Sequence, residues 1–104
     1  MDTEKREVLI DRMTENLPVL RKKLRLSQEN LANLMGSSRY TVMQIETGKR
    51  RMTWNTFLSL ILLFDINKDT TGLLRALEIY TDEFDRMIKH KPGPSSASAE
   101  KERE

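Results

Sequence analysis

Four polar side chains share the exposed side of a short predicted helix. The hydrophobic spacing predicts this helix over residues 39–47, with only Val42 and Ile45 on its buried side. The side chains left outside are Arg39, Tyr40, Thr41 and Gln44. Arginine can pair with O6 and N7 of guanine, glutamine with N6 and N7 of adenine, and tyrosine or threonine can contact a phosphate or a thymine methyl group. Because the first turn of a helix in the major groove reaches the base edges, this pattern indicates DNA recognition.

Groups that suit phosphate lie on both sides of this helix. Ser27 and Ser38 each precede a predicted helix, and the free N–H groups at a helix N-terminus bind phosphate, helped by the positive end of the helix dipole. Three cations follow the helix and are placed to hold the DNA backbone on its far side: Lys49, Arg50 and Arg51. For each residue alone, an ordinary exposed position is the alternative interpretation. Taken as a set, the residues favour DNA.

Short helices must position these side chains. Ser27 is a suitable N-cap for a helix over residues 28–35. The inward positions of that helix are Leu31, Ala32 and Met35. A break at Gly36 follows, Ser38 caps the next helix, and Gly48 ends it in a left-handed conformation. Two short helices joined by a turn of about three to four residues that contains glycine are typical of a helix-turn-helix.

The charge of the chain is unevenly distributed. Lysine and arginine total 18 and aspartate and glutamate 16, which gives a net charge of +2. Residues 19–51 hold eight basic and two acidic residues, a local charge of +6, so the remainder sums to −4. Such a concentrated basic segment is expected of a surface that binds a polyanion. A solvated basic face without a partner fits the charge pattern equally well.

The composition of the 104 residues excludes several classes of protein. The chain has no cysteine and one histidine, His90, so it cannot assemble a thiol active site or the usual ligand set of a metal; we expect no cofactor. The longest apolar stretch, residues 57–64, is far shorter than the ~18 residues of a membrane span, and the N-terminus has no apolar signal segment. No nucleophile is paired with a base, so an enzyme is not expected. A cytoplasmic location away from membranes is predicted.

The remaining segments also predict helices, so the expected fold class is all-α. A short amphipathic helix is expected within residues 1–15, followed by a helix that Thr14 or Asn16 caps and that runs to about Arg25. Pro18 is tolerated in the first turn of that helix. Its inward stripe is Leu17, Leu20 and Leu24. The predicted DNA-binding domain covers residues 16–68, an additional C-terminal helix 69–90, and a disordered tail without large apolar residues 91–104.

Three runs of residues carry a family resemblance. They are LRKKLRLSQENLA at 20–32, MGSSR at 35–39 and IETGKR at 45–50. Over about residues 17–67 the chain resembles the Xre or Cro/CI-type helix-turn-helix family of transcriptional repressors. The resemblance implies a compact, lambda-repressor-like bundle of about five short helices, in which the fourth runs from Thr53 or Trp54 to Phe64.

The resemblance also implies roles for single residues. Gln28 is expected to contact phosphate and to brace the recognition helix. The positions that contact bases or phosphates are Ser38, Arg39, Tyr40 and Gln44. The positions that contact the DNA backbone are Thr47, Lys49 and Arg50. Apart from the resemblance, Ser37 in the turn is a further candidate DNA-binding residue. An arginine of the first helix pairs with the glutamate that ends the recognition helix, here Arg21 with Glu46, and this partly buried pair positions the recognition helix.

The fourth helix has more apolar surface than one buried side needs. Its inward stripe is Trp54, Leu58, Ile61 and Phe64, and the additional apolar residues are Leu60, Leu62 and Leu63. Downstream, apolar residues recur at intervals of four, three, four and three: Leu73, Leu77, Tyr80, Phe84 and Met87. This heptad stripe, together with Leu60 and Leu63, predicts either a dimer seam or a terminal helix that folds back onto its own domain, and both can hold together.

These patterns predict a sequence-specific regulator of transcription. In this interpretation a homodimer binds a palindromic operator in double-stranded DNA and acts as a repressor. The alternative is an antitoxin-type protein that represses its own operon and binds a small toxin as its partner. The apolar surplus of the fourth helix and the stripe after Gly72 motivate that alternative.

Overall fold

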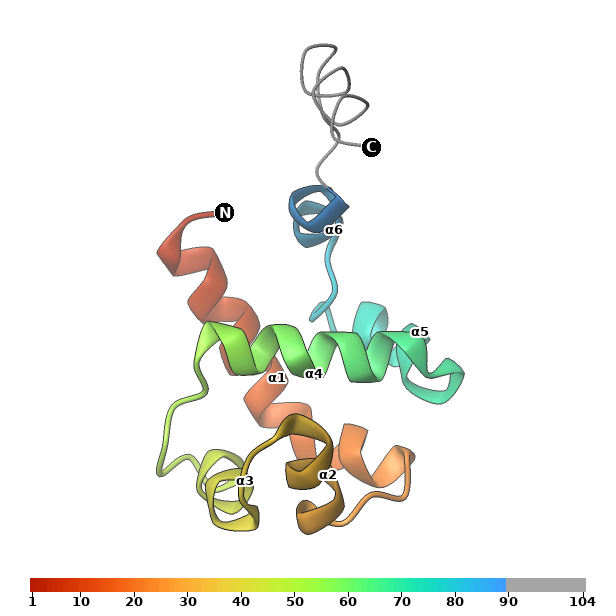
Figure 1. The fold of residues 1–104 in the computed structure, drawn as a ribbon. Coiled ribbons are helices and arrows are strands. Elements are labelled where there is room, and N and C mark those ends of the chain that lie inside the picture. Colours follow the sequence, from red (N-terminus) through yellow and green to blue (C-terminus); the bar gives the residue numbers. More distant parts are fainter. Residues whose placement is uncertain (90–104) are drawn as a thin grey trace, which may run out of the picture.

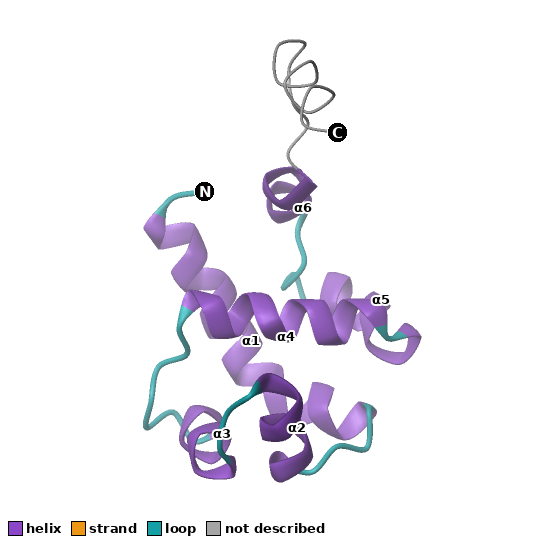
Figure 2. Cartoon of the chain, viewed as in Figure 1, coloured by secondary structure: helices purple, strands orange, loops and turns teal. Residues whose placement is uncertain are grey.

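The computed structural model describes residues 1–89, which form six α-helices and no strand (Figure 1, Figure 2). In chain order the helices are α1 (Thr3–Lys23), α2 (Gln28–Met35), α3 (Arg39–Glu46), α4 (Trp54–Ile66), α5 (Lys68–Ala76) and α6 (Asp82–Lys89). The all-α bundle that the sequence predicts is confirmed. His90 and the predicted disordered tail, residues 91–104, lie outside the described residues.

The first helix is one continuous element of 21 residues, and the prediction of two separate helices is wrong. The predicted caps Thr14 and Asn16 lie inside α1, where each side chain donates a hydrogen bond to the carbonyl four residues earlier. The N-cap is Asp2. The helix continues through Pro18, which lacks the N–H for one helical hydrogen bond, because its buried residues stay in phase on both sides of the proline. These residues are Leu9, Ile10, Met13, Leu17 and Leu20.

Serine caps begin α2 and α3, as predicted. Ser27 Oγ accepts a hydrogen bond from the Asn30 N–H at 3.0 Å, and Ser38 Oγ accepts one from the N–H three residues further on at 3.1 Å. Gly36, with φ +66°, ends α2, and Gly48, with φ +79°, follows α3. Glycine adopts these left-handed conformations without steric cost, so both turns can be tight.

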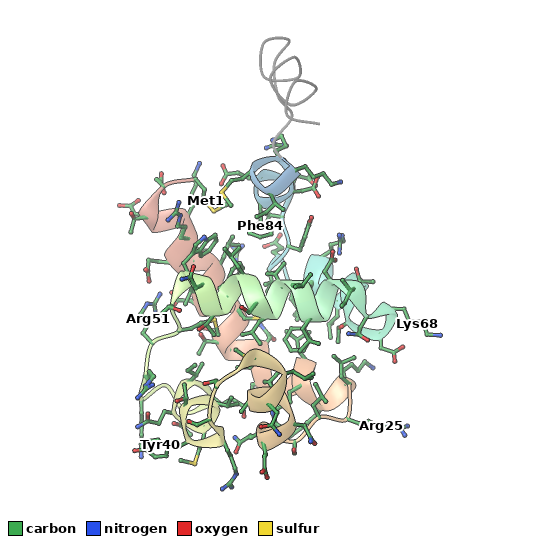
Figure 3. The ribbon with its side chains drawn as sticks, viewed as in Figure 1. Met1, Arg25, Tyr40, Arg51, Lys68 and Phe84 are labelled. Atoms are coloured by element: carbon green, nitrogen blue, oxygen red, sulfur yellow. The ribbon has the colours of Figure 1, made fainter. Side chains whose placement is uncertain are left out.

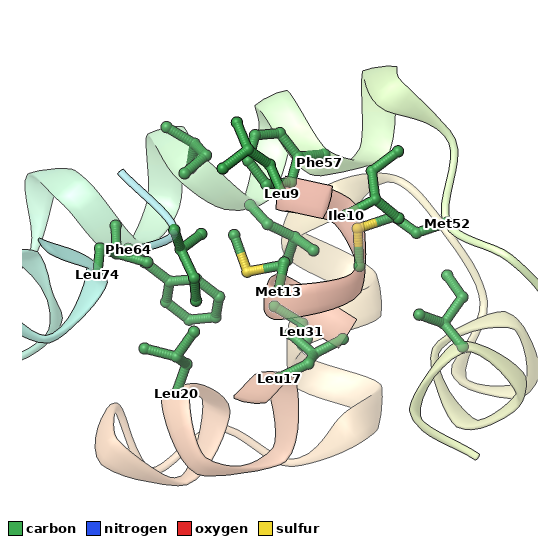
Figure 4. Close-up of a cluster of buried hydrophobic side chains, with 14 of the residues drawn as sticks. Leu9, Ile10, Met13, Leu17, Leu20, Leu31, Met52, Phe57, Phe64 and Leu74 are labelled. Carbon is green, nitrogen blue, oxygen red and sulfur yellow. The ribbon is translucent and has the colours of Figure 1, made fainter. Parts of the chain in front are cut away.

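The hydrophobic core lies between α1 and α4, and the other helices close it (Figure 4). Figure 4 shows Leu9, Met13 and Phe57 close together, with Phe64 beside Leu74 of α5. The largest fully buried side chains are Phe57, Phe64, Phe84, Met13, Leu17, Leu20, Leu31, Leu60, Leu74 and Ile79. Residues 1–15 therefore share one core with the helix-turn-helix and do not form a separate extension.

Helix α4 begins after the cap Thr53 and ends at Ile66, two residues later than predicted. Its buried side is Phe57, Leu60, Ile61 and Phe64. Trp54 and Leu58, which the sequence places inward, are half-buried. Leu60 was predicted to add surface for helix packing or a dimer, and it is completely buried in the core of its own chain. The reason is that α1, α2 and α5 all pack against α4.

The C-terminal segment folds as two helices, so the prediction of one helix over residues 69–90 is wrong. α5 ends at Ala76, Glu78 takes a left-handed φ of +58°, and Thr81 Oγ1 accepts a hydrogen bond from the Phe84 N–H at the start of α6. The heptad stripe is interrupted and cannot form a continuous coiled-coil seam. Phe84 is fully buried, and the other stripe residues pack partly buried against the same core: Leu73, Leu77, Tyr80 and Met87. Within residues 1–89 the fold-back alternative is the one observed.

Phe84 anchors α6 in a cluster of aromatic rings. Its ring lies edge-on to those of Trp54, Phe57 and Tyr80, with centroid distances of 6.1, 5.7 and 5.2 Å. The Tyr80 hydroxyl donates a hydrogen bond to Asp85 at 2.7 Å, and this bond, with burial, raises the pKa of Tyr80 to about 12. Edge-to-face pairs add stabilisation beyond the area they bury, so Phe84 is the main attachment of α6.

We predict that Phe84→Ala lowers the free energy of unfolding by about 3–5 kcal/mol, because it leaves a cavity under α6. Arg86→Ala, at an exposed position of the same helix, is the matched control and should change it by less than about 0.5 kcal/mol. Urea unfolding followed by circular dichroism measures both. Equal unfolding midpoints for the two variants would contradict the docking of α6.

Candidate nucleic-acid interface

The exposed side of α3 carries the residues predicted to contact DNA. Arg39 and Tyr40 are exposed in the first turn, and Thr41 and Gln44 are half-buried further along the helix. The buried side consists of Val42 and Ile45, as predicted. Figure 3 shows Tyr40 at the end of the molecule opposite Phe84. The first turn of α3 therefore lies on the surface, at the end of the molecule away from α6.

A hydrogen bond joins two side chains of this surface. Gln44 Nε2 donates to the Tyr40 hydroxyl oxygen at 2.9 Å. Gln44 Oε1 is buried and has no hydrogen-bond partner within residues 1–89. A buried acceptor without a donor is energetically costly, so the amide gains when a donor outside the protein reaches it. The N6 amino group of adenine is a donor of this kind.

The C-terminal end of α3 is fixed by Glu46. Arg21 Nε donates to Glu46 Oε2 at 2.7 Å and Arg21 Nη2 donates to Oε1 at 3.1 Å. Gln28 Nε2 donates to the same Oε1 at 3.0 Å. The predicted pair is thus present, and Gln28 braces α3, the helix that the resemblance implies to be the recognition helix. Both charged side chains are mostly buried, at 11% and 6% exposure.

Arg21 also fixes the turn after α1. Its Nη1 donates to the Leu26 carbonyl at 2.9 Å. In the same turn Arg25 adopts a left-handed φ of +57°, and the Leu26 N–H bonds back to the Arg21 carbonyl at 3.1 Å. One guanidinium group therefore joins the end of α1 and the turn before α2 to the end of α3.

Six of the eight cations between residues 19 and 51 make no ion pair with any residue of the described part, residues 1–89. They are Lys22, Lys23, Arg25, Arg39, Lys49 and Arg50. Figure 3 shows Arg25 and Tyr40 at the same end of the molecule. The same segment has two acids, Glu29 and Glu46. Glu46 forms an ion pair with Arg21, whereas Glu29 makes no ion pair within residues 1–89. The surface around α2 and α3 is therefore a concentrated source of positive potential.

Arg51 is held against α1 and is not part of this surface, unlike the sequence-based expectation. Its Nε donates to Glu7 Oε2 at 2.6 Å and its Nη1 donates to Asp11 Oδ1 at 2.8 Å, both on α1. These hydrogen bonds to Asp11 and Glu7 raise the pKa of Arg51. The two carboxylates lie four residues apart on one helix face, so together they hold the guanidinium and attach the loop before α4 to α1.

The hydroxyl groups around α3 are mostly engaged in local bonds. Ser27 and Ser38 act as caps, so phosphate contact at these helix starts falls to the free N–H groups of the first turns. Thr47 Oγ1 donates to the Met43 carbonyl at 3.0 Å and closes the end of α3. Ser37 is exposed in the turn. Its hydroxyl is not among those that make these local bonds within residues 1–89.

The sequence reasoning missed two contributors to this arrangement. Asn30 completes a capping box with Ser27, and its signal was a polar residue three positions after the cap. Glu7 and Asp11 hold Arg51, and their signal was the i, i+4 spacing of two acids within the apolar pattern of α1.

Within residues 1–89, no group of three or more metal-ligating side chains comes together. None of the helices in this part of the chain combines the length and the apolar character that a membrane span needs. Comparison of the chain with models of protein families, with curated proteins and with solved structures finds no match.

We predict that Glu46→Gln destabilises the fold by about 3 kcal/mol, because it leaves the buried Arg21 without its counter-charge. Glu83→Gln removes one carboxylate charge from the exposed ion pair with Lys5 and serves as the matched control. Urea unfolding measures the difference between the two. Unfolding curves of Glu46→Gln and Glu83→Gln that both overlay the wild-type curve would refute the proposed role of the Arg21–Glu46 pair.

Proposed function

We propose that this protein is a sequence-specific DNA-binding regulator of transcription of the Xre, Cro/CI-type class. The observation that carries the proposal is the exposed side of α3, where residue types that can read bases stand among cations that make no ion pair with any of residues 1–89. Arg39 and Tyr40 open this side, and Lys49 and Arg50 follow it. The helix-turn-helix signature and the resemblance support the same function.

In the proposed complex, α3 lies in the major groove with its first turn toward the bases. Arg39 donates to O6 and N7 of guanine, a contact that arginine makes with two parallel hydrogen bonds. Gln44 gives up its hydrogen bond to Tyr40 and pairs with adenine instead. Its buried Oε1 thereby gains the donor that it lacks within residues 1–89 of the free protein. Tyr40 is then free to contact a phosphate or a thymine methyl group.

The backbone contacts fix the register of this reading helix. Lys49 and Arg50 bind phosphates beyond the C-terminal end of α3, and the free N–H groups at the starts of α2 and α3 bind phosphates as well. Each phosphate contact releases counterions, so the affinity falls as salt rises. These contacts add affinity for every sequence and orient the helix for the bases.

Two copies of the chain would read a palindrome. A single helix makes few base contacts, and each good bidentate contact discriminates by only about 1–3 kcal/mol. A homodimer with two-fold symmetry places two α3 helices on half-sites about 10 bp apart. Occupation of such an operator in the cytoplasm would repress the promoter that contains it.

A second candidate function is an antitoxin-type protein that represses its own operon and binds a toxin. The observation that favours it is apolar surface left on α4, where Leu62 and Ile66 are exposed. Co-purification of a second small protein, lost when Leu62 is replaced by glutamate, would support this candidate.

The proposal predicts different effects for two kinds of variant. Gln44→Ala should lose about 1–3 kcal/mol of discrimination at one base position, because one bidentate contact is removed. Lys49→Ala should weaken binding to all sequences and lower the salt slope by about one, because one phosphate contact is removed. Fluorescence anisotropy on a duplex selected from a random pool, and on its single-base variants, measures both effects.

The matched control for Lys49→Ala is Lys68→Ala. Lys68 is an exposed lysine at the start of α5, and Figure 3 shows it far from Tyr40. Its removal should leave the affinity and the salt slope near wild type. Equal losses for Gln44→Ala on every sequence, or equal losses for the two lysine variants, would contradict the assigned roles.

A further inference from the structure

Helix α4 leaves a ridge of apolar side chains open to solvent. Leu62 is 64% exposed and Ile66 71% exposed, one helical turn apart on the same face. Leu34 of α2 and Ile88 of α6 lie on either side of them at 62% and 49% exposure. We call these four residues the α4 strip. A contiguous exposed apolar patch of this kind usually marks a site of interaction with a partner.

The ridge of the strip stands between two apolar hollows. One hollow, of about 260 Å³, lies toward α2 and has walls that include Leu34, Met35 and Leu63. The other, of about 290 Å³, lies toward α6 and has walls that include Leu58, Tyr80 and Ile88. Leu62 and Ile66 belong to the walls of both hollows. In Figure 1, α4 runs between α2 and α6.

The strip is nearly free of charge, unlike most of the surface. One third of the chain consists of charged residues, yet α4 has a single ionisable side chain, Asp65. Asp65 accepts hydrogen bonds from Arg75 at 2.7 Å and from the Thr71 hydroxyl at 2.8 Å, so its charge is compensated within the chain. The exposed polar neighbours on α4, Asn55 and Ser59, are neutral.

These features favour a second copy of the same chain as the partner. In a two-fold interface the same patch meets itself, so it must be self-complementary in shape and in charge. A ridge beside a hollow fulfils the first condition, because the ridge of each copy can enter a hollow of the other. The part of the strip on α4 fulfils the second, because its one charge, Asp65, is paired with Arg75. Charged side chains border the Leu34 edge, where the cations Lys23 and Arg25 and the acid Asp69 line the neighbouring hollow.

We propose that the α4 strip is the interface of a two-fold symmetric homodimer. Leu62 and Ile66 of one protomer pack into the hollows of the other, with Leu34 and Ile88 at the edges of the contact. The strip overlaps the heptad stripe after Gly72 only at the hollow toward α6, whose walls include Tyr80 and Phe84. The residues of that stripe pack against the core of their own chain.

The position of the strip connects it to the DNA-reading helix. Leu34 and Met35 form the end of α2, and the short turn after them leads into the first turn of α3. A partner on the strip therefore contacts the end of α2, the helix that leads through this turn into α3. This step rests on the proposed function: the dimer would supply the second α3 that a palindromic operator needs, and DNA binding and dimerisation would strengthen each other.

Sedimentation equilibrium of the full chain, without DNA and at tens to hundreds of micromolar, tests the interface. We expect wild type to approach the dimer mass and Leu62→Glu to stay at the monomer mass, because the dimer would bury two charges against apolar walls. Val19→Glu is the matched control, since Val19 is a 55% exposed apolar residue of α1 outside the strip. This variant should dimerise like wild type.

Ile66→Glu is a second, independent variant with the same expected result, and circular dichroism verifies that each variant is folded. If Leu62→Glu loses helix content, Ile66→Glu alone tests the interface. A wild-type chain that stays monomeric over the whole concentration range overturns the proposal, and so do folded glutamate variants with the wild-type mass. Because the mass is measured without DNA, a chain that dimerises through the strip but binds no DNA refutes the proposed function alone.

A single cysteine gives a second readout of the interface. The chain has no cysteine of its own, so Leu62→Cys introduces a unique thiol. Under mild oxidation we expect Leu62→Cys to form a disulfide-linked dimer much faster than Val19→Cys, because the strip brings the two copies of residue 62 together. Equal rates for the two variants would contradict the symmetric packing.

Discussion

The arrangement of the helix-turn-helix region depends on one carboxylate, Glu46. Arg21 reaches it with two hydrogen bonds and Gln28 with a third, so the end of α1, the start of α2 and the end of α3 meet at one point. A buried charge is tolerated only when its partners are fixed, and this requirement fixes the angle between the two helices of the turn. The exposed side of α3 has a defined direction as a consequence, before any ligand is present.

Much of the fold follows from local signals in the sequence. Serine caps and left-handed glycines gave the bounds of α2 and α3, since these bounds depend on bonds between near neighbours. The extent of α1 could not be obtained in this way, because Pro18 suggests a boundary that packing against α3, α4 and α5 overrides. The break near Glu78 is likewise a tertiary effect, since it lets Phe84 reach the aromatic cluster.

The residues of the candidate site also differ in whether local sequence signals can assign them. Residues on one helix face, such as Arg39 and Gln44, can be assigned to the exposed side from periodicity alone. The partners of a long side chain cannot, because they come from distant segments: Arg51 reads as a phosphate contact, yet it bonds to Glu7, 44 residues earlier. Leu60 shows the same limit, since its neighbours in α1 and α5 decide that it belongs to the core.

If the exposed side of α3 reads a DNA sequence, selection of duplexes from a random pool should enrich one motif. We expect this motif to have two half-sites about 10 bp apart. Anisotropy of the selected and a scrambled duplex at several salt concentrations should then show a clear preference for the motif that persists as salt rises. An unenriched pool, with weak, equal and steeply salt-dependent binding to both duplexes, would leave only a basic surface and contradict DNA reading by α3.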